Sequence, residues 1–216
     1  MHFEILVEDQ SGKRMLDILT PKIIDNQHSF KVHAYQGIGR IPSNLTSSTD
    51  ARNRLLLDQL PRLLRGYGNT FANYPANYPA AVILVCDLDD KCLKAFREEL
   101  FTVLDTCNPK PEARFCIAIE EGEAWLLGDI PAIKIAYPNA RDSVLNRYEN
   151  DSICGTWELL ADAVFQGGSS ALRRRGGQAV GIEKLAWAEH ITPHMNVEIN
   201  KSPSFYYFRR KIRELT

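Results

Sequence analysis

An uninterrupted apolar run, AVILVC at residues 81–86, is the feature that most restricts how this chain can fold. Runs of this length and composition are typical of strands that are buried on both faces of a parallel sheet. A similar run, RFCIAI, follows at residues 114–119, and two earlier segments at 3–7 and 29–35 also have strand character. The sequence therefore predicts a mostly parallel sheet whose later strands are fully buried.

Segments with apolar residues at helical spacing separate these strands and predict helices over residues 11–24, 51–65 and 91–104. We expect Asp50 to cap the second of these helices and Pro61 to kink or break it. The alternation of strands and helices predicts an α/β fold, with a Rossmann-like, mostly parallel sheet flanked by helices on both faces.

The strand signals fade after about residue 129, and the remaining segments predict helices. We therefore expect an α/β core over residues 1–129 and a mostly helical extension over residues 130–216, packed together as one compact unit. A chain of 216 residues is long enough to bury such a core. Near its end, Ser202 is a fitting N-cap and Pro203 a fitting first residue for a last helix.

The formal net charge of −1 argues against a protein that holds nucleic acid by its overall charge. Any basic surface must then be local, and the candidates for contacts with phosphate groups are Arg40 and the run Arg173, Arg174 and Arg175. No apolar run approaches the roughly 20 residues that span a bilayer, and the N-terminus does not resemble a signal peptide. The five cysteines are odd in number and scattered, so we expect a cytoplasmic location.

Acidic residues follow three of the predicted strands, at the point where each strand ends. They are Glu8 after the first strand, Asp87 and Asp89 after the third, and Glu120, Glu121 and Glu123 after the fourth. Ligands of parallel α/β sheets gather at the carboxyl ends of the strands. We therefore expect these acids to come together at one edge, although each could alternatively cap a helix or lie in solvent.

Clustered carboxylates repel one another and take up protons unless a cation compensates their charge. Oxygen ligands of this kind suit Mg²⁺ or Mn²⁺, and Mg²⁺ works with few carboxylates, with waters and with substrate phosphates. The chemistry that this arrangement favours is phosphoryl transfer or cleavage of a phosphodiester.

The segments that carry these acids resemble a known family. A strand that ends in Glu, followed by a strand that ends in Asp-x-Asp, resembles the Toprim catalytic domain of topoisomerases, primases and overcoming-lysogenization-defect (OLD) type nucleases. The chain is most similar to a Toprim-like group known as domain of unknown function 4276. The matching segments are FEILVED, VILVCDLDDKC, IAIEEGEAWLLGD and the tail GIEKLAWAEHITPHMNVEINKSPSFYYF.

The resemblance implies roles for individual residues. Glu8 matches the Toprim glutamate, which is a metal ligand or general acid/base, and Asp87 and Asp89 match the Asp-x-Asp metal ligands. Glu121 and Glu123 match the acids that precede the family's Ala-Trp. Toprim domains usually carry Gly after the glutamate, where this chain has Asp9. This difference from the family bears on the role of Glu8.

The function that the resemblance implies is a Mg²⁺-dependent nuclease that acts on nucleic acid in a bacterial phage-defence system. It also implies a partner ATPase of the ABC or AAA type, and it leaves a homodimer open. Two alternatives stay open. The sequence Asp87-Leu88-Asp89 also fits a haloacid-dehalogenase-like phosphatase, although Lys91 replaces the expected Thr or Val. The chain could instead be a non-catalytic regulatory or adaptor subunit of an ATPase.

Overall fold

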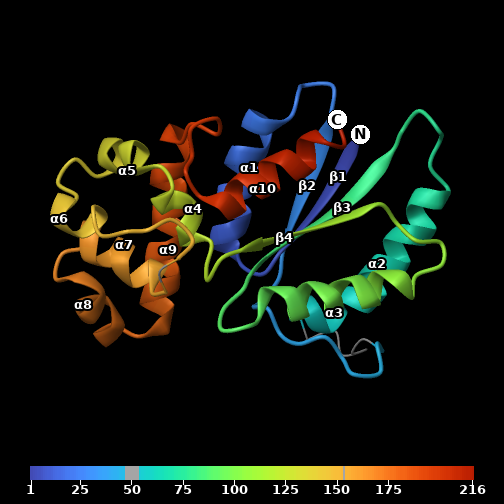
Figure 1. Ribbon diagram of the computed structural model, residues 1–216, viewed down its shortest axis with the longest axis horizontal. Helices are drawn as coiled ribbons and strands as arrows, with labels where there is room; N and C mark the ends of the chain where they lie inside the picture. The colour runs from blue at the N-terminus through green and yellow to red at the C-terminus, as the bar shows by residue number, and fades with distance from the viewer. Residues whose placement is uncertain (47–53, 153) are drawn as a thin grey trace.

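The computed structural model describes residues 1–46, 54–152 and 154–216 of the chain. In this described part, four parallel strands form one sheet in the order β2-β1-β3-β4 (Figure 1). The strands are β1 (His2–Val7), β2 (Ser29–Ala34), β3 (Ala80–Asp87) and β4 (Ala113–Ala118). The predicted α/β fold with a parallel, helix-flanked sheet is confirmed.

Helices cover both faces of the sheet. One face carries α1 (Gln10–Ile23) and α10 (Pro203–Arg213), and the other carries α2 (Leu56–Ala72) and α3 (Leu93–Asp105), as Figure 1 shows. Residues 81–86 of β3 are all buried, as the apolar run predicts. Their side chains alternate between the two layers, and each layer has its own core cluster.

Helix α2 differs from its prediction at both ends. It begins at Leu56 and continues to Ala72, whereas the sequence indicated residues 51–65. Pro61 lies inside the helix and does not end it, because a stripe of buried leucines, which includes Leu60 and Leu64, holds both sides of the proline against the sheet. The expected cap, Asp50, lies outside the described residues.

Gly68 of α2 packs against the backbone of the loop that precedes β4. A Cβ atom added to Gly68 would lie 2.0 Å from the carbonyl oxygen of Pro109, whereas one added to Gly66 would meet nothing within 4 Å. We expect Gly68→Ala to lower the free energy of unfolding by about 1–3 kcal/mol, because the backbone must move. Gly66→Ala is the matched control and should raise it by about 0.5–1 kcal/mol through helix propensity. Denaturant unfolding measures both, and equal effects of the two substitutions would contradict this packing.

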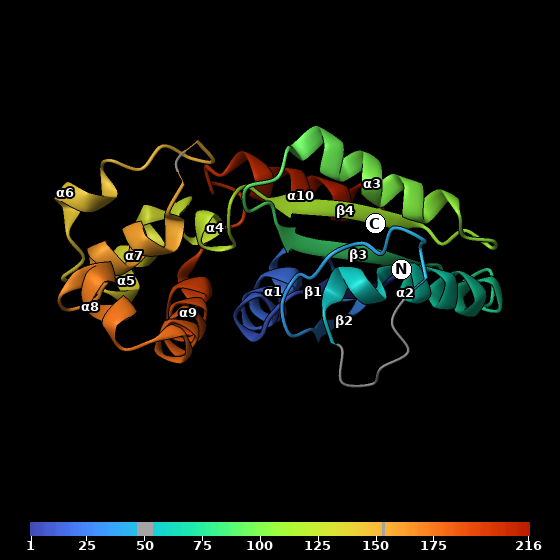
Figure 2. The same cartoon turned by 90° about the horizontal axis from the view of Figure 1, so that it is seen from below.

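The chain after β4 is helical, as predicted. The helices are α4 (Glu123–Leu127), α5 (Ile130–Ala136), α6 (Asp142–Leu145), α7 (Thr156–Val164), α8 (Gly168–Arg174) and α9 (Gly177–Ile191), followed by the 3₁₀ turn η1 (Thr192–His194) and by α10. Figures 1 and 2 show α5 to α9 gathered beyond the end of the sheet to which β4 points. Helix α9 packs on α1, so this group covers the carboxyl ends of the strands.

Large aromatic side chains join α4 to α10, the helix that packs on β4. Trp125 of α4 is fully buried and stacks on Phe208 of α10 with ring centroids 4.9 Å apart. Its indole Nε1–H donates a hydrogen bond of 2.9 Å to Ser204 Oγ. The hydroxyl of Ser202 accepts a hydrogen bond from the Phe205 N–H, which confirms the predicted cap of the last helix. Among the described residues, no helix has the length and apolar character needed to cross a membrane.

Candidate functional site

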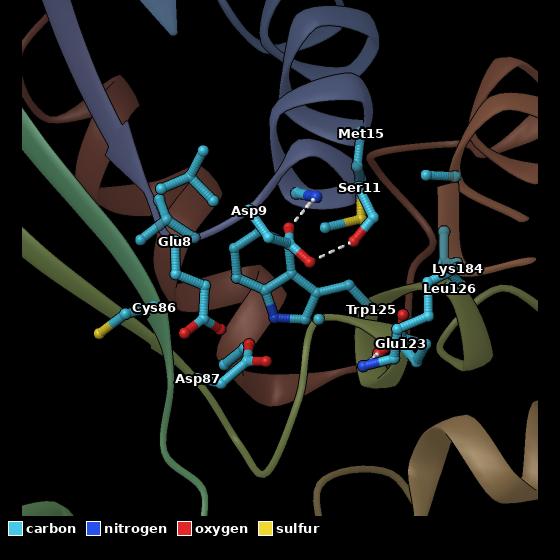
Figure 3. Close-up of a pocket in the computed structure, with 16 residues that line it drawn as sticks. Glu8, Asp9, Ser11, Met15, Cys86, Asp87, Glu123, Trp125, Leu126 and Lys184 are labelled. Carbon is cyan, nitrogen blue, oxygen red and sulfur yellow. Dashed lines mark hydrogen bonds and ion pairs between the residues drawn. The ribbon is translucent and has the colours of Figure 1, made fainter. Parts of the chain in front are cut away.

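Two acidic side chains meet at the carboxyl edge of the sheet. Strands β1 and β3 are adjacent and parallel, with Val7 paired to Val85, so Glu8 and Asp87 end neighbouring strands. Figure 3 shows their carboxyl groups turned toward one another. The geometry of a parallel sheet thus brings together two acids that lie far apart in the sequence.

Glu8 and Asp87 hydrogen-bond to each other through their side chains. A hydrogen bond between two carboxyl groups requires that one of them carries a proton. Burial raises the pKa of Asp87 well above its ordinary value, and the neighbouring charge of Glu8 adds to this rise. Burial likewise raises the pKa of Glu8, against the opposing effect of the hydrogen bond from Asp87. The pair therefore holds a shared proton under conditions where isolated carboxyl groups are ionised.

A small cavity of about 30 Å³ lies beside this pair. Charged side chains form one part of its lining and come from Glu8, Asp87, Glu123 and Lys184 (Figure 3). Apolar side chains form the other part and include Val7, Met15, Val85 and Trp125. A cavity needs roughly 10–15 Å³ to hold a water molecule, so this one has room for a water or an ion. The apolar walls lower the local dielectric constant, which strengthens each electrostatic interaction inside.

Lys184 of α9 supplies a positive charge to the acidic cluster. Its Nζ lies 3.0 Å from Glu121 Oε1 and 3.0 Å from Glu123 Oε2. Burial alone would lower the pKa of Lys184, but the charges of Glu123, Glu121 and Asp87 outweigh this effect and raise it. Lys184 is thus a charged member of the site, and the sequence analysis did not identify it.

Glu123 is 5% exposed, and its burial has a consequence for stability. Burial raises its pKa from 4.5 to about 7, although the ammonium group of Lys184 opposes the rise. Between these two pH values the folded protein keeps a proton that the unfolded chain has lost. Binding of this proton therefore stabilises the folded protein fully below pH 4.5, and the stabilisation is lost as the pH rises to about 7.

We expect wild-type protein to lose about 3 kcal/mol of stability across this range, at about 1.4 kcal/mol for each pH unit. Glu123→Gln has no carboxyl group to titrate and should flatten the dependence. Denaturant unfolding at several pH values between 4.5 and about 7 measures it. A slope that is unchanged in Glu123→Gln would contradict the assignment of this effect to Glu123.

Glu120 and Glu121 anchor the start of α7. The carboxylate of Glu120 accepts hydrogen bonds from the N–H groups of Gly155 and of Thr156, the latter at 2.9 Å. Glu121 Oε2 accepts from the Thr156 hydroxyl at 3.0 Å and from the Trp157 N–H at 3.2 Å. Negative charge at a helix N-terminus is stabilising, so both acids have a structural role there. Glu121 also contacts Lys184 and belongs to the site as well.

Asp9 caps α1, and its carboxylate points toward that helix and not toward Glu8. Its carboxylate accepts hydrogen bonds of 2.7 Å from the Gly12 N–H and 2.7 Å from the Ser11 hydroxyl (Figure 3). Asp9 therefore starts the helix after β1. This capping directs the Asp9 charge toward α1 and leaves Glu8 free to face Asp87.

Asp89 lies apart from the cavity. Its backbone has a φ of 51°, and its side chain is 45% exposed and pairs with Lys91 Nζ at 3.1 Å. The structure therefore does not bring Asp89 into contact with Asp87, and a role of Asp89 as metal ligand stays a prediction. Its charge still contributes to the raised pKa of Glu8.

The predicted phosphate-binding arginines lie on surface segments away from the cavity lining. Arg40 is exposed, and its backbone N–H donates to Asp58 Oδ1 at 2.8 Å. Arg173 pairs with Glu158 and lies 5.2 Å from the centre of the Trp157 ring. Arg175 lies 4.9 Å from the centre of the Phe165 ring, and Arg174 is exposed. Contacts of these four with nucleic acid stay a prediction.

The carboxylate oxygens that line the cavity are ligands of the kind that hard divalent cations prefer. Among the described residues, no three His, Cys, Asp or Glu side chains are already arranged as a set of metal ligands. Mg²⁺, however, is commonly bound through one or two carboxylates, with waters and phosphate oxygens completing the shell. Glu8 and Asp87 could supply those two carboxylates, and the room beside them could hold the ion.

Fold and site together define an α/β protein with an acidic, lysine-compensated cavity at the carboxyl edge of its sheet. Comparisons of the chain with models of protein families, with curated proteins and with solved structures find no match. An assignment of function therefore depends on the geometry of this cavity and on the chemistry of its side chains.

Proposed function

We propose that this protein is a Mg²⁺- or Mn²⁺-dependent phosphodiester hydrolase of Toprim type that acts on nucleic acid. The observation that supports this most is the pair of carboxyl groups of Glu8 and Asp87, which face one another next to a cavity with room for an ion (Figure 3). Two carboxyl groups buried side by side cost free energy unless a proton or a cation compensates them. A divalent cation would replace the shared proton and recover that cost.

Each side chain has a distinct part in this proposal. A bound Mg²⁺ would polarise the phosphate group of the substrate. Glu8 and Asp87 would release their shared proton to solvent and hold the ion with carboxylate oxygens. Lys184 would keep Glu121 and Glu123 in place and offset their charge. The apolar walls formed by Met15 and Trp125 would exclude competing water from the carboxyl pair.

The resemblance to the Toprim-like group extends the proposal to the cellular setting. On that basis the substrate is nucleic acid, the setting is a bacterial phage-defence system in the cytoplasm, and a partner ATPase of the ABC or AAA type controls the activity. The resemblance leaves a homodimer open.

A second candidate is a non-catalytic adaptor or regulatory subunit, and Lys184 is the observation that favours it. An internal ammonium group already neutralises part of the acidic cluster, so the cluster could stabilise the fold without any metal. The two candidates differ in one measurable property. A hydrolase of the proposed type binds divalent cations at Glu8 and Asp87, whereas a purely structural cluster does not.

The deciding experiment combines calorimetric titration with Mg²⁺ and Mn²⁺ and an assay on single- and double-stranded DNA and RNA. The expected result is saturable cation binding that releases a proton, together with cleavage that EDTA abolishes. A small phosphate ester serves as the control substrate, because a haloacid-dehalogenase-like phosphatase would hydrolyse it. Absence of cation binding and of cleavage would overturn the hydrolase and favour the adaptor.

A further inference from the structure

A second cavity of about 370 Å³ opens between β4, α3 and the start of α10, and it shares no lining residue with the acidic site. Its floor is apolar and is formed by Leu93, Phe115, Ile117 and Ile119. Its volume falls within the range of roughly 300–1,000 Å³ that is usual for ligand pockets. Ile119 directly precedes Glu120, so the cavity lies near the same carboxyl edge as the acids.

Tyr207 of α10 lines this cavity beside three cationic side chains, of which Arg210 and Lys211 pair with Glu214. The ring centre lies 5.3 Å from Arg97 Cζ, 5.7 Å from Arg210 Cζ and 5.6 Å from Lys211 Nζ. Arg97 also donates a hydrogen bond of 3.2 Å to the Tyr207 hydroxyl. In the described part of the chain, Arg97 forms no ion pair with a carboxylate, so its charge remains available to an anion.

The start of α3 adds to the positive potential at the cavity mouth. This 13-residue helix begins at Leu93, and Cys92 before it provides no side-chain hydrogen bond to the first turn. The free N–H groups and the helix dipole favour a negative group there. Lys94 lies in the same turn. A more open hollow runs on from the cavity along α3 and is lined by Leu93, Lys94, Arg97, Glu98 and Phe101.

Asn150 contributes a side-chain amide to the cavity wall. Its Oδ1 is buried, and it has no hydrogen-bond partner among the residues that the structure describes. A buried acceptor without a partner is unfavourable, so the amide has little to hold it in this orientation. By turning, it can offer an oxygen or a nitrogen to a ligand, and such an amide can pair with the edge of a nucleobase. Asp151 also lines the cavity, where its carboxylate accepts hydrogen bonds from the Ser202 hydroxyl and the Ser204 N–H.

The geometry points to a binding site for one nucleotide of a single-stranded nucleic acid. The base would enter the cavity against Tyr207, with its edge at Asn150, and the adjoining phosphate would lie at Arg97 and the start of α3. An aromatic ring beside a basic groove is how proteins hold single strands without reading a long sequence. A duplex would not fit, because its bases are stacked and paired away from such a pocket. This inference rests on the proposed function in that it names the form of the substrate.

Binding measured in EDTA tests this site without any need for cleavage. We expect a labelled single-stranded oligonucleotide to bind the full chain more tightly than the matching duplex does. Tyr207→Ala should weaken this binding, because it removes the ring and the hydroxyl that hold Arg97 beside the base. Arg97→Gln should weaken it and lower the slope of its salt dependence by about one ion. Asn150→Asp, which places a negative charge at the base edge, should also weaken binding.

Arg209→Gln is the matched control, because it removes an arginine of the same helix that lies 5.3 Å from the centre of a different aromatic ring, that of Tyr206, outside this cavity. It should bind as the wild type does, and thermal unfolding should show that each variant is folded. Equal affinity for duplex and single strand, equal affinity for a free mononucleotide, or unchanged binding by Arg97→Gln and Asn150→Asp would each overturn the inference. If the single strand binds as expected in EDTA but is not cleaved when Mg²⁺ or Mn²⁺ is supplied, the proposed function is contradicted and the binding site is still supported.

Discussion

Replacement of Asp87 by asparagine is expected to abolish metal-dependent cleavage and, at the same time, to make the metal-free protein more stable. The amide keeps the shape of the side chain and can still hydrogen-bond to Glu8, but it cannot carry the charge that a cation requires. Loss of this ligand should lower the cleavage rate at least about 100-fold, since a metal supplies several kcal/mol of stabilisation to the transition state. The gain in stability should be about 0.5–2 kcal/mol.

The stability effect has a definite dependence on pH. Burial and the charge of Glu8 raise the pKa of Asp87, so the cost of its charge appears as the pH rises. Asp87→Asn should therefore stabilise the protein in alkaline solution and have little effect in acid, where the wild-type carboxyl group is protonated. Thermal unfolding in EDTA at both ends of the pH range measures this effect.

Asp89→Asn is the matched control for Asp87→Asn. Its side chain is exposed and pairs with Lys91, so its replacement should leave stability unchanged at either pH. Its effect on cleavage reports whether Asp89 joins the site when a cation binds. Cleavage that persists in Asp87→Asn would contradict the proposed function, whatever the control shows.

The meeting of Glu8 with Asp87 could be predicted because it depends on few physical facts. A short apolar run such as residues 81–86, followed at once by acidic residues, is typical of a buried strand, and parallel strands end at the same edge of a sheet. An acid that directly follows such a strand therefore lies at the carboxyl edge of the sheet. The register of β1 on β3 then decides that these two acids are neighbours.

Other parts of the site depend on contacts that no local pattern encodes. Lys184 reaches Glu121 from a helix 63 residues further along the chain, and its position follows from the packing of α9 on α1. The left-handed backbone of Asp89 turns its side chain to Lys91, which the motif Asp-x-Asp does not indicate. One signal could have identified Lys184: a lone lysine within the apolar segment GIEKLAWA, in a chain whose strand ends carry excess acid.

Lys184→Met should destabilise the metal-free protein more than any other single change in this site. The substitution keeps an unbranched side chain that is one atom shorter, and it removes the charge that faces Glu121 and Glu123. Loss of one partner from a buried ion pair costs about 3–5 kcal/mol, because the remaining charge has no compensation. The loss should be largest above the pKa of Glu123, about 7, and should shrink in acid, where that carboxyl group is neutral.

Divalent cations should change this result in a way that separates the two candidate functions. If the acidic cluster binds cations, millimolar Mn²⁺ replaces the missing positive charge and returns part of the lost stability to Lys184→Met. Denaturant unfolding with Mn²⁺ and with EDTA measures the difference, and Lys184→Arg, which keeps the charge, should show little of it. A Lys184→Met protein that Mn²⁺ does not stabilise would mean that the cluster has no affinity for cations. That result would favour the adaptor over the hydrolase.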